Sequence, residues 1–370
     1  MITVREVTSR ADFKKFVAFP YDLYRGDRLW VPYLRSEVEY LFSAKNPFWL
    51  HAERALYLAL DGERVVGRVA AIKDDELVTF RTEREGVFGF YESVNDAAVG
   101  RALYGAAEDW LRSRGMTRLV GPMNPSTNEE CGFLLEGFET PPYIMMTHTP
   151  PYYLGLAEGC GYEKAMDLQA WLAPITERNL ARLDRVAAGV RRRWPELELR
   201  HVDVKRFAEE VELVRQIYNR AWEDNWGFVP ATPAEFDDVA KRLKSLVEPK
   251  LVWLATVGAD PAGFVMAIPN YNEVLAKMGG SMNPISIIKF ITGKKKIKGI
   301  RLMLFGVCKE YRQRGIDACL MYESNKAALA LGFKEVEFSW VLEGNEMTNR
   351  AASMMGGRVY KNYRIYTKDL

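Results

Sequence analysis

The chain contains one residue pattern twice, 196 positions apart. In 58–72 a Leu-Ala pair is followed after seven residues by Gly67 and then by alternating apolar positions, and 254–268 repeats this spacing around Gly263. Each copy has an apolar run, a turn that contains Gly and a second apolar run, which is typical of a β-hairpin. Similarity at so long a period indicates one domain used twice.

The other predicted elements follow the same order in both halves. In the first half we expect a strand at 2–7, a helix from Ser9 into Pro20, the hairpin, a strand at 88–91, a helix capped by Asn95 and ended by Gly115, and a strand at 119–121. In the second half we expect a helix at 207–222, the hairpin, a strand at 302–307, a helix at 315–331 ended by Gly332, a strand at 336–342 and a helix opened by Asn345. The two helix-ending glycines differ by 217 positions, so 21 residues are inserted between 269 and 301.

Mixed helices and strands in this order predict an α/β (α+β) fold. The 370 residues are enough for about two domains. We place a first domain at 1–172, a helical linker at 173–197 and a second domain at 198–370.

Composition argues against several function classes. A net charge of +2 gives no general attraction to nucleic acid, so we do not expect a nucleic-acid partner. The four cysteines and three histidines show no metal-binding spacing, so we expect reduced thiols and no metal site. The sequence shows neither a signal peptide nor an apolar run of about 20 residues, and we expect a cytoplasmic protein.

The stretch 307–316 carries the strongest indication of chemistry. It lies where a predicted strand turns into a predicted helix, and Gly315 at that junction lets the backbone approach a ligand closely. The free amides at the start of such a helix, together with the helix dipole, favour an anion there.

This stretch resembles the acetyl-CoA pyrophosphate loop of the GCN5-related N-acetyltransferases (GNAT), whose consensus is Arg/Gln-x-x-Gly-x-Gly/Ala after a Val-x-Pro strand end. Val307, Arg312 and Gly315 match it, whereas Lys309 replaces the proline and Asp317 replaces the second small residue. Downstream positions that share the family's spacing are Asn345, Thr348, Gly356 and Gly357. The resemblance covers about 198–370 and extends more faintly, through the repeat, to 1–172.

The resemblance implies two tandem GNAT-like domains, each a mixed, mostly antiparallel sheet flanked by helices. It also implies a coenzyme A (CoA) thioester, acetyl-CoA or acyl-CoA, as co-substrate. The residues it assigns to that thioester are Phe305, Gly306, Val307, Arg312, Gln313, Arg314, Gly315, Ile316 and Asn345. In the first half Asn95, Ala98 and Gly100 stand opposite Arg312, Gly315 and Asp317, so we expect one CoA site, in the second domain, beside a degenerate first domain.

The usual GNAT catalysts are missing. Many members use a tyrosine acid at the position of Ala352 and a carboxylate on the strand before the loop, where 301–305 has none. Glu223 and Asp224, between Trp222 and Trp226, are candidates for proton transfer and for binding an ammonium group by charge and cation–π contact. A solvated turn with core tryptophans is the alternative.

Two further candidates lie in the first half. The polar loop 121–132 could line a substrate site through Asn128 and Glu130, although a turn cluster with no ligand role is an equal alternative. His148, with Tyr152 nearby, could be the catalytic base and part of a substrate site. A structural histidine is the alternative there.

The inserted segment is strongly basic. Between Glu273 and Glu310 there is no acidic residue, and eight are basic. Isoleucines beside lysines within 277–301 fit a peripheral contact with the inner face of a membrane, or docking of an acidic acyl carrier protein. A solvated charge run is the third interpretation.

Together these features predict an acyltransferase that moves an acyl group from a CoA or carrier-protein thioester to an amine acceptor, long-chain or lipid-like, which enters between the domains. Bacterial tandem members of the superfamily include enzymes that resemble ceramide synthases, which acylate a sphingoid amine. Two alternatives are a FemX-like transferase that uses aminoacyl-tRNA and a non-catalytic protein that binds an acyl thioester.

Overall fold

The computed structural model describes residues 1–81 and 83–370, which form two compact units. Unit 1 comprises Met1–Leu168, Asn272–Thr292 and Lys361–Leu370. Unit 2 comprises Gln169–Tyr271 and Gly293–Tyr360. The chain passes between the units four times, at 168/169 inside β9 (Glu163–Pro174), at 271/272, at 292/293, and at 360/361 inside β15 (Arg358–Asp369).

Unit 1 has a mixed sheet with strand order β1-β2-β3-β4-β5-β15, antiparallel except for the β4–β5 pair, and β8 pairs with β15. Its strands are β1 (Ile2–Glu6), β2 (Ala52–Asp61), β3 (Arg64–Asp74), β4 (Glu85–Ser93), β5 (Arg118–Gly121), β6 (Met123–Asn124), β7 (Glu130–Cys131) and β8 (Phe133–Glu136). Its helices are α1 (Arg10–Leu23), α2 (Arg35–Leu41), η1 (Pro47–Leu50), α3 (Asp75–Arg81), α4 (Ala97–Arg112), α5 (Tyr152–Glu158), α9 (Asn272–Leu275) and α10 (Pro284–Gly293).

Unit 2 repeats this plan with strand order β9-β14-β13-β12-β11-β10, where β13 and β14 are the parallel pair. Its strands are β10 (Leu197–His201), β11 (Val252–Val257), β12 (Asp260–Pro269), β13 (Gly299–Val307) and β14 (Glu335–Leu342). Its helices are α6 (Glu177–Arg193), η2 (Val204–Arg206), α7 (Phe207–Trp222), α8 (Pro233–Leu243), η3 (Pro249–Leu251), η4 (Lys294–Lys296), η5 (Lys309–Tyr311), α11 (Ile316–Ala330) and α12 (Glu346–Met354).

The two hairpins agree in detail with the sequence repeat. The register shifts after Ala59 in β2 and after Ala255 in β11, which are 196 positions apart. A Cβ on Gly67 would lie 2.7 Å from Leu103 of α4, and one on Gly263 would lie 3.2 Å from Leu320 of α11. The neighbouring strand is close as well, because the same Cβ atoms would lie 3.0 Å from the Glu92 carbonyl oxygen and 2.8 Å from that of Gly306, so both glycines lie where a helix and a strand leave little room.

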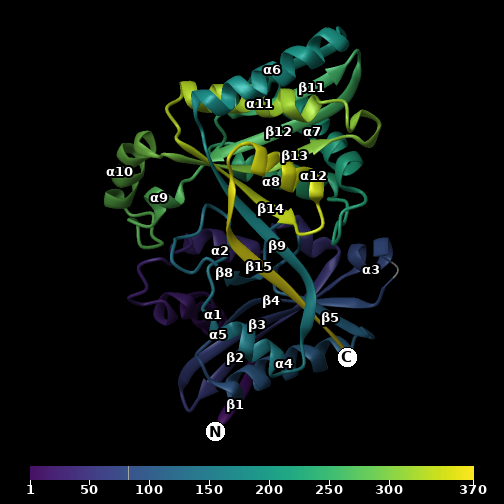
Figure 1. Cartoon of the computed structure of the whole chain (residues 1–370). Coiled ribbons are helices and arrows are strands. Elements are labelled where there is room, and N and C mark those ends of the chain that lie inside the picture. Colours follow the sequence, from purple (N-terminus) through teal and green to yellow (C-terminus); the bar gives the residue numbers. More distant parts are fainter. Residues whose placement is uncertain (82) are drawn as a thin grey trace. The chain divides into compact units, whose positions relative to one another are not determined.

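Helices cover both faces of each sheet (Figure 1). Neighbouring residues of a strand point to opposite faces. In unit 1, the residue after Gly67 is Arg68, whose guanidinium lies 4.9 Å from the ring of Phe16 in α1. In unit 2, the residue after Gly263 is Phe264, whose ring lies 5.7 Å from that of Trp222 in α7. Thus α1 covers one face of the unit 1 sheet and α4 the other. In unit 2, α7 and α11 take the corresponding places.

The predicted helix ends are correct, and one predicted cap is wrong. Gly115 and Gly332 follow α4 and α11 with left-handed φ of 75° and 90°, which favours glycine. The cap of α4 is Asp96 and not Asn95, because Oδ1 of Asp96 accepts the amide of Ala98 at 2.7 Å. The predicted caps Ser9 and Asn345 are confirmed.

The compact units differ from the predicted sequence ranges. Helix α6, inside the predicted linker, belongs to unit 2 and packs along α11. The last ten residues belong to unit 1 because β15 pairs there with β5. The inserted segment belongs to unit 1 from Asn272 to Thr292. There, Nδ2 of Asn272 donates to the Pro142 carbonyl at 3.0 Å. These are non-local pairings, which hydrophobic periodicity along the chain does not reveal.

Each unit has its own apolar core. In unit 1 the core between the sheet and α4 is rich in aromatic side chains, among them Phe88, Tyr91, Tyr104, Phe133 and Tyr153. In unit 2 one core cluster is Ile217, Leu254, Phe264 and Cys308. Across residues 1–81 and 83–370, no helix combines the length and the apolarity that crossing a bilayer requires.

Candidate active site

The two central parallel strands of unit 2 separate halfway along. Strand β13 pairs with β14 only from Gly299 to Leu302, whereas its pairing with β12 continues to Val307. The register with β12 shifts at Met303, which is the mark of a β-bulge. Beyond Leu302, the edge of β13 that faces away from β12 has no strand partner in the described part of the chain. Backbone groups on this edge are available to a ligand.

The loop that joins β13 to α11 presents a row of free amides. Gln313 and Gly315 both have left-handed φ, 60° and 83°, and Gly315 caps α11 without any side-chain bond. Among the described residues, the amides from Gln313 to Ala318 have no acceptor. The next amide, that of Cys319, donates to the Gly315 carbonyl at 3.2 Å. The amides from Gln313 to Ala318 therefore form the type of site that binds phosphate groups.

Glycine is required at position 315. A Cβ there would lie 2.5 Å from Cγ2 of Val190 in α6, and the left-handed φ adds strain for any other residue. The same close approach holds the loop against α6. Ile316, the first residue of α11, is fully buried and anchors the helix start.

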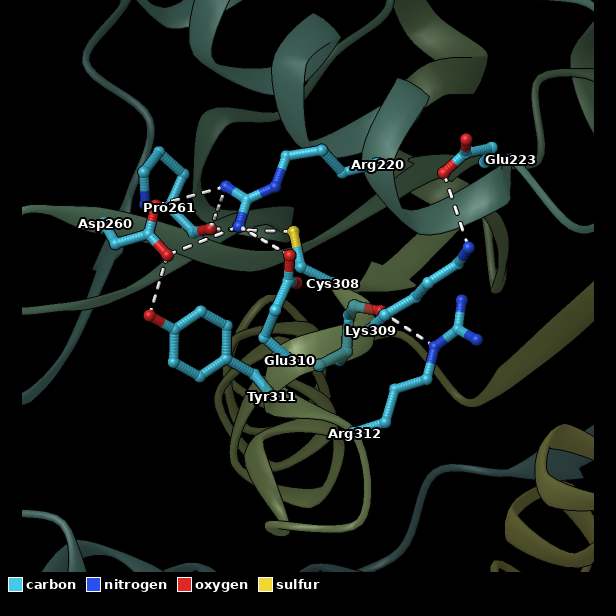
Figure 2. Close-up of polar contacts among 10 residues, drawn as sticks. Arg220, Glu223, Asp260, Pro261, Cys308, Lys309, Glu310, Tyr311 and Arg312 are labelled. Atoms are coloured by element: carbon cyan, nitrogen blue, oxygen red, sulfur yellow. Dashed lines mark hydrogen bonds and ion pairs between the residues drawn. The ribbon is translucent and has the colours of Figure 1, made fainter.

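Arg312 fixes the loop through backbone carbonyls. Its Nη2 donates to the carbonyl of Ala221 at the end of α7 at 2.7 Å, and its Nε donates to the carbonyl of Val307 at 3.3 Å. Figure 2 shows the side chains of Arg312 and Tyr311 pointing to opposite sides of the loop. In this structure Arg312 thus holds β13, α7 and the loop together.

A second network secures the start of the loop to the β11–β12 turn (Figure 2). Arg220 donates to Asp260 at 3.1 Å and lies 3.5 Å from Glu310, and Tyr311 donates to Asp260 at 2.7 Å. The hydrogen bonds from Arg220 and Tyr311 lower the pKa of Asp260. Burial raises the pKa of the neighbouring Cys308 thiol to about 11, so this thiol stays protonated at neutral pH.

The two candidate acids pair with the residue that departs from the GNAT consensus. Nζ of Lys309 lies 3.4 Å from Glu223, a pair drawn in Figure 2, and 2.9 Å from Asp224. All three side chains are exposed. The hydrogen bond from Lys309 to Asp224 raises the pKa of the lysine. The acidic turn after α7 and the loop that replaces Pro with Lys are therefore complementary.

The aromatic residues of this turn differ in position. Trp222 stacks on Tyr218 with ring centroids 4.7 Å apart and lies against Gly306, where a Cβ would be 2.4 Å from the indole. It is therefore part of the core beneath β13, as the alternative interpretation proposed. Trp226 lies in the following turn and is half-buried.

The remaining predicted CoA residues lie on both sides of the opening. Phe305 and Val307 belong to the end of β13 that pairs with β12 alone, and the guanidinium of Arg314 lies 4.7 Å from the ring of Trp194. Asn345 caps α12 through Oδ1, which accepts the amide of Thr348 at 3.1 Å. Asp317, in the first turn of α11, is half-buried and has no hydrogen bond or ion pair to another described residue.

A buried ion pair lies where β13 and β14 part. Arg301 and Glu337 face each other in the register, their side chains 3.9 Å apart, and Glu337 has no exposed surface. Ser339 connects them, because it accepts from Arg301 at 2.9 Å and donates to Glu337 at 2.5 Å. Tyr360 donates to the other oxygen of Glu337. Arg301 thus belongs to the interior and not to an exposed basic run.

The corresponding opening in unit 1 is closed by the chain itself. Strand β4 pairs with β5 only from Glu85 to Val87, so these strands also separate. Strand β6 fills the gap: the amide of Phe90 donates to Oδ1 of Asn124 at 2.6 Å, and a Cβ on Gly89 would lie 1.8 Å from the carbonyl oxygen of Met123. The start of α4 is closed too, because the carboxylate of Asp96 occupies its amides. In unit 1 the chain's own residues thus occupy both places that are open in unit 2.

Unit 1 contains a buried polar cluster instead. Oε2 of Glu92 accepts from the hydroxyls of Tyr24 and Tyr153, both at 2.7 Å, and burial raises the pKa of Glu92. Nε2 of His148 lies 2.8 Å from Oδ2 of Asp27, while Nδ1 is buried and has no hydrogen-bond partner among the described residues. Burial lowers the pKa of His148, and the bond to Asp27 offsets part of this effect.

The other first-half candidates lie in the same unit. Glu130 in β7 accepts from the hydroxyl of Tyr33 at 2.8 Å. Asn128 is exposed in the turn before β7, with its amide 3.2 Å from Oγ of Ser126. Tyr152, at the start of α5, donates to the Ser93 carbonyl at 2.8 Å, and burial raises its pKa to about 12. His148, Asn128, Glu130 and Tyr152 thus belong to unit 1, and every other predicted site residue belongs to unit 2.

Sequence reasoning missed three parts of this arrangement. These are the carbonyl of Ala221, the Arg220–Asp260–Tyr311 network and the Asp27 partner of His148. No local motif marks them, because each joins residues that are distant in sequence. Among the described residues, no group of three or more His, Cys, Asp or Glu side chains could hold a metal ion.

Comparison with known proteins agrees with this geometry. No family model matches the chain. A tandem GNAT protein from the clavulanic acid biosynthesis pathway superposes with a TM-score of 0.56 at 14% identity, covering 100% of this chain and 98% of that one, which is a likeness in fold.

Two curated relatives are similar over their whole length. A protein of Caulobacter vibrioides (strain NA1000 / CB15N) named bacterial ceramide synthase is 40% identical, covering 100% of this chain and 98% of the relative. The protein YghO of Escherichia coli (strain K12) is 36% identical, covering 99% and 95%. The chain therefore belongs to the family that includes these two relatives, and it has the fold of the tandem GNAT protein. The predicted α/β fold with two GNAT-like domains is confirmed.

Proposed function

We propose that this protein is an N-acyltransferase that moves an acyl group from a CoA thioester to an amine. The observation that carries the proposal is the free amide row from Gln313 to Ala318 beside the open edge of β13, in one unit only. A diphosphate fits such a row because the amides and the helix dipole both attract negative charge. The equivalent places in unit 1 are taken by Asp96 and Asn124.

The open edge of β13 suits the rest of the donor. Beyond Leu302, its backbone groups can bond the amides of an extended pantetheine arm, as an added strand would. A backbone amide near the bulge at Met303 can then polarise the thioester carbonyl. We infer that the acyl chain enters next to this bulge.

The chemical step needs a neutral amine and a route for two protons. The amine nitrogen attacks the thioester carbonyl carbon, the C–S bond breaks, and CoA leaves as a thiolate that takes up a proton. The proton lost by the amine must pass to a base. Glu223 and Asp224 are candidates within unit 2, where both pair with Lys309 of the loop. His148 of unit 1 is a further candidate, because Asp27 holds Nε2 and leaves Nδ1 as the basic atom, and burial lowers its pKa.

We propose a long-chain, sphingoid-like amine as acceptor. This rests on the 40% identity with the relative named bacterial ceramide synthase. The assay tests acylation of a sphingoid amine directly. The protein is incubated with sphinganine and acyl-CoA of several chain lengths, and the N-acyl product is measured by mass spectrometry. An acyl carrier protein thioester is offered in parallel as donor.

Two results would overturn the proposal. One is calorimetry showing no binding of CoA or acyl-CoA to the intact chain. The other is thioester binding without transfer to sphinganine, to shorter alkyl amines or to amino sugars, because this leaves a thioester-binding protein. We expect one bound CoA per chain and amide formation that depends on acyl-CoA.

A further inference from the structure

Helix α10 exposes apolar side chains to solvent, unlike an ordinary surface helix. Its isoleucines are exposed, with 67% of Ile285, 62% of Ile288, 55% of Ile291 and 40% of Ile287 accessible. The residue it buries is Ser286, whose amide donates to Oδ1 of Asn283 at 2.9 Å. Surface helices normally bury the apolar face and expose the polar one. The pattern is inverted here.

The exposed isoleucines form one continuous strip. At about 100° per residue, the four lie within an arc of about 160°, and Ser286 and Phe290 lie together on the opposite side. Met282, just before the helix, is also 53% exposed. Apolar surface of this extent on a single helix marks an interaction site.

Positive charge flanks this strip without acidic residues. Lys277 and Lys289 are exposed in unit 1, and the chain runs directly from α10 into η4, Lys294–Lys296, whose side chains are exposed as well. None of these five lysines pairs with a carboxylate in the described ranges 1–81 and 83–370. The segment 274–309 contains no Asp or Glu at all.

We infer that α10, with its flanking lysines, docks on the surface of an anionic lipid bilayer. The isoleucines would enter the boundary between headgroups and acyl chains, and the lysines would meet anionic headgroups. The cations favour lipid over an acidic protein partner, because all five are lysines, and protein interfaces are enriched in arginine and depleted of lysine. The inference does not depend on the enzymatic activity proposed above.

The test is sedimentation of the full-length protein with vesicles. Vesicles of phosphatidylethanolamine, phosphatidylglycerol and cardiolipin are compared with vesicles of phosphatidylcholine at low and high salt. We expect binding to the anionic vesicles only, weakened by salt because screening reduces the attraction of the lysines.

Two triple variants separate the two contributions. Ile285→Ser/Ile288→Ser/Ile291→Ser should lower the partition coefficient about tenfold or more, because three apolar side chains no longer leave water. Lys294→Gln/Lys295→Gln/Lys296→Gln should lower it about 100-fold, at about fivefold per lysine. Matched controls are Leu50→Ser, 82% exposed in η1, and Lys14→Gln/Lys15→Gln on α1, which should bind like the wild type.

Several results would overturn the inference. Absence of binding to anionic vesicles is one, and binding that neither triple variant reduces is another. Dimers that dissociate in the isoleucine variant, without vesicle binding by the wild type, would assign the strip to self-association. Binding of an acidic acyl carrier protein, again without vesicle binding, would assign it to that partner. Unchanged thermal unfolding of both variants excludes loss of fold as the cause.

Discussion

The amide of Phe90 donates to Oδ1 of Asn124 at 2.6 Å, on the edge of β4 where the equivalent edge of β13 stays open. The two units have the same hairpin, the same bulge region and the same parting of two parallel strands. They differ in whether the gap is filled by the chain's own residues. Because these features are shared, unit 1 serves as an internal comparison for the site proposed in unit 2.

The first prediction concerns the charge at the start of α11. Gly315→Asn and Gly315→Asp have the same size and share the strain of a left-handed φ near Val190, which we expect to cost about 1–3 kcal/mol. Only the aspartate adds a negative charge to the amide row. Calorimetry should therefore show weakened CoA binding for Asn and none for Asp. Equal affinities would contradict a diphosphate at this helix start.

A second prediction separates the two possible roles of Arg312. If it acts by holding the carbonyls of Ala221 and Val307, Arg312→Leu should reduce the free energy of unfolding by about 2 kcal/mol. Arg312→Lys, which cannot bond both carbonyls in the same way, should lie in between. Urea denaturation measures both. A stable Leu variant that has lost only CoA binding would instead indicate direct phosphate contact.

The third prediction concerns the closed gap in unit 1. Gly89→Ala places a Cβ 1.8 Å from the Met123 carbonyl oxygen, so β6 would have to move, at a cost of about 3 kcal/mol or more. Gly105→Ala in α4 is the matched control, because nothing lies within 4 Å of its Cβ and alanine favours a helix by up to about 1 kcal/mol. Thermal unfolding should show opposite shifts. Similar shifts would mean that β6 is not held in the gap.

The fourth prediction follows from the lowered pKa of His148. In the unfolded chain the pKa of this histidine is close to the ordinary value of 6.5, and in the folded state its pKa is lower because burial disfavours the cation. As pH falls below 6.5, the unfolded state takes up the proton first, so the free energy of unfolding decreases until the folded pKa is passed. Above that window the histidine contributes nothing to the pH dependence.

His148→Gln provides the measurement. Between pH 7 and pH 5 the variant should lose less stability than the wild type, in denaturant titrations at each pH. If His148 is also the base, kcat should fall about 10²–10⁴-fold, and the acid limb of the kcat/KM profile, with its midpoint below 6.5, should disappear. A full acid limb in the variant would exclude His148 as the base. Asp27→Asn should give a milder loss of activity.

Local patterns determined the repeated architecture. The spacing around Gly67 and Gly263 predicted both hairpins. Side chains alternate between the two faces of a strand, and a crossing helix favours glycine, so apolar residues and glycine recur at fixed spacing. Gly115 and Gly332 marked helix ends because a left-handed φ favours glycine. The sequence marked the Arg312–Gly315 motif at a predicted helix start, and the structure adds that Val190 and a left-handed φ require glycine at position 315.

Contacts between distant segments were decided by the tertiary structure. In the sequence, Lys309 is a departure from a consensus, and Glu223 and Asp224 are two acids between tryptophans, with no visible link between them. The fold pairs the lysine with both acids across more than 80 positions. The sequence left open whether Trp222 belongs to a binding turn or to the core, and the fold packs it against Gly306 and the core of unit 2. Asn124 closes the gap in unit 1, and the isoleucines of α10 stay exposed, because of which faces of the helices and strands pack together. Hydrophobic periodicity does not encode that choice.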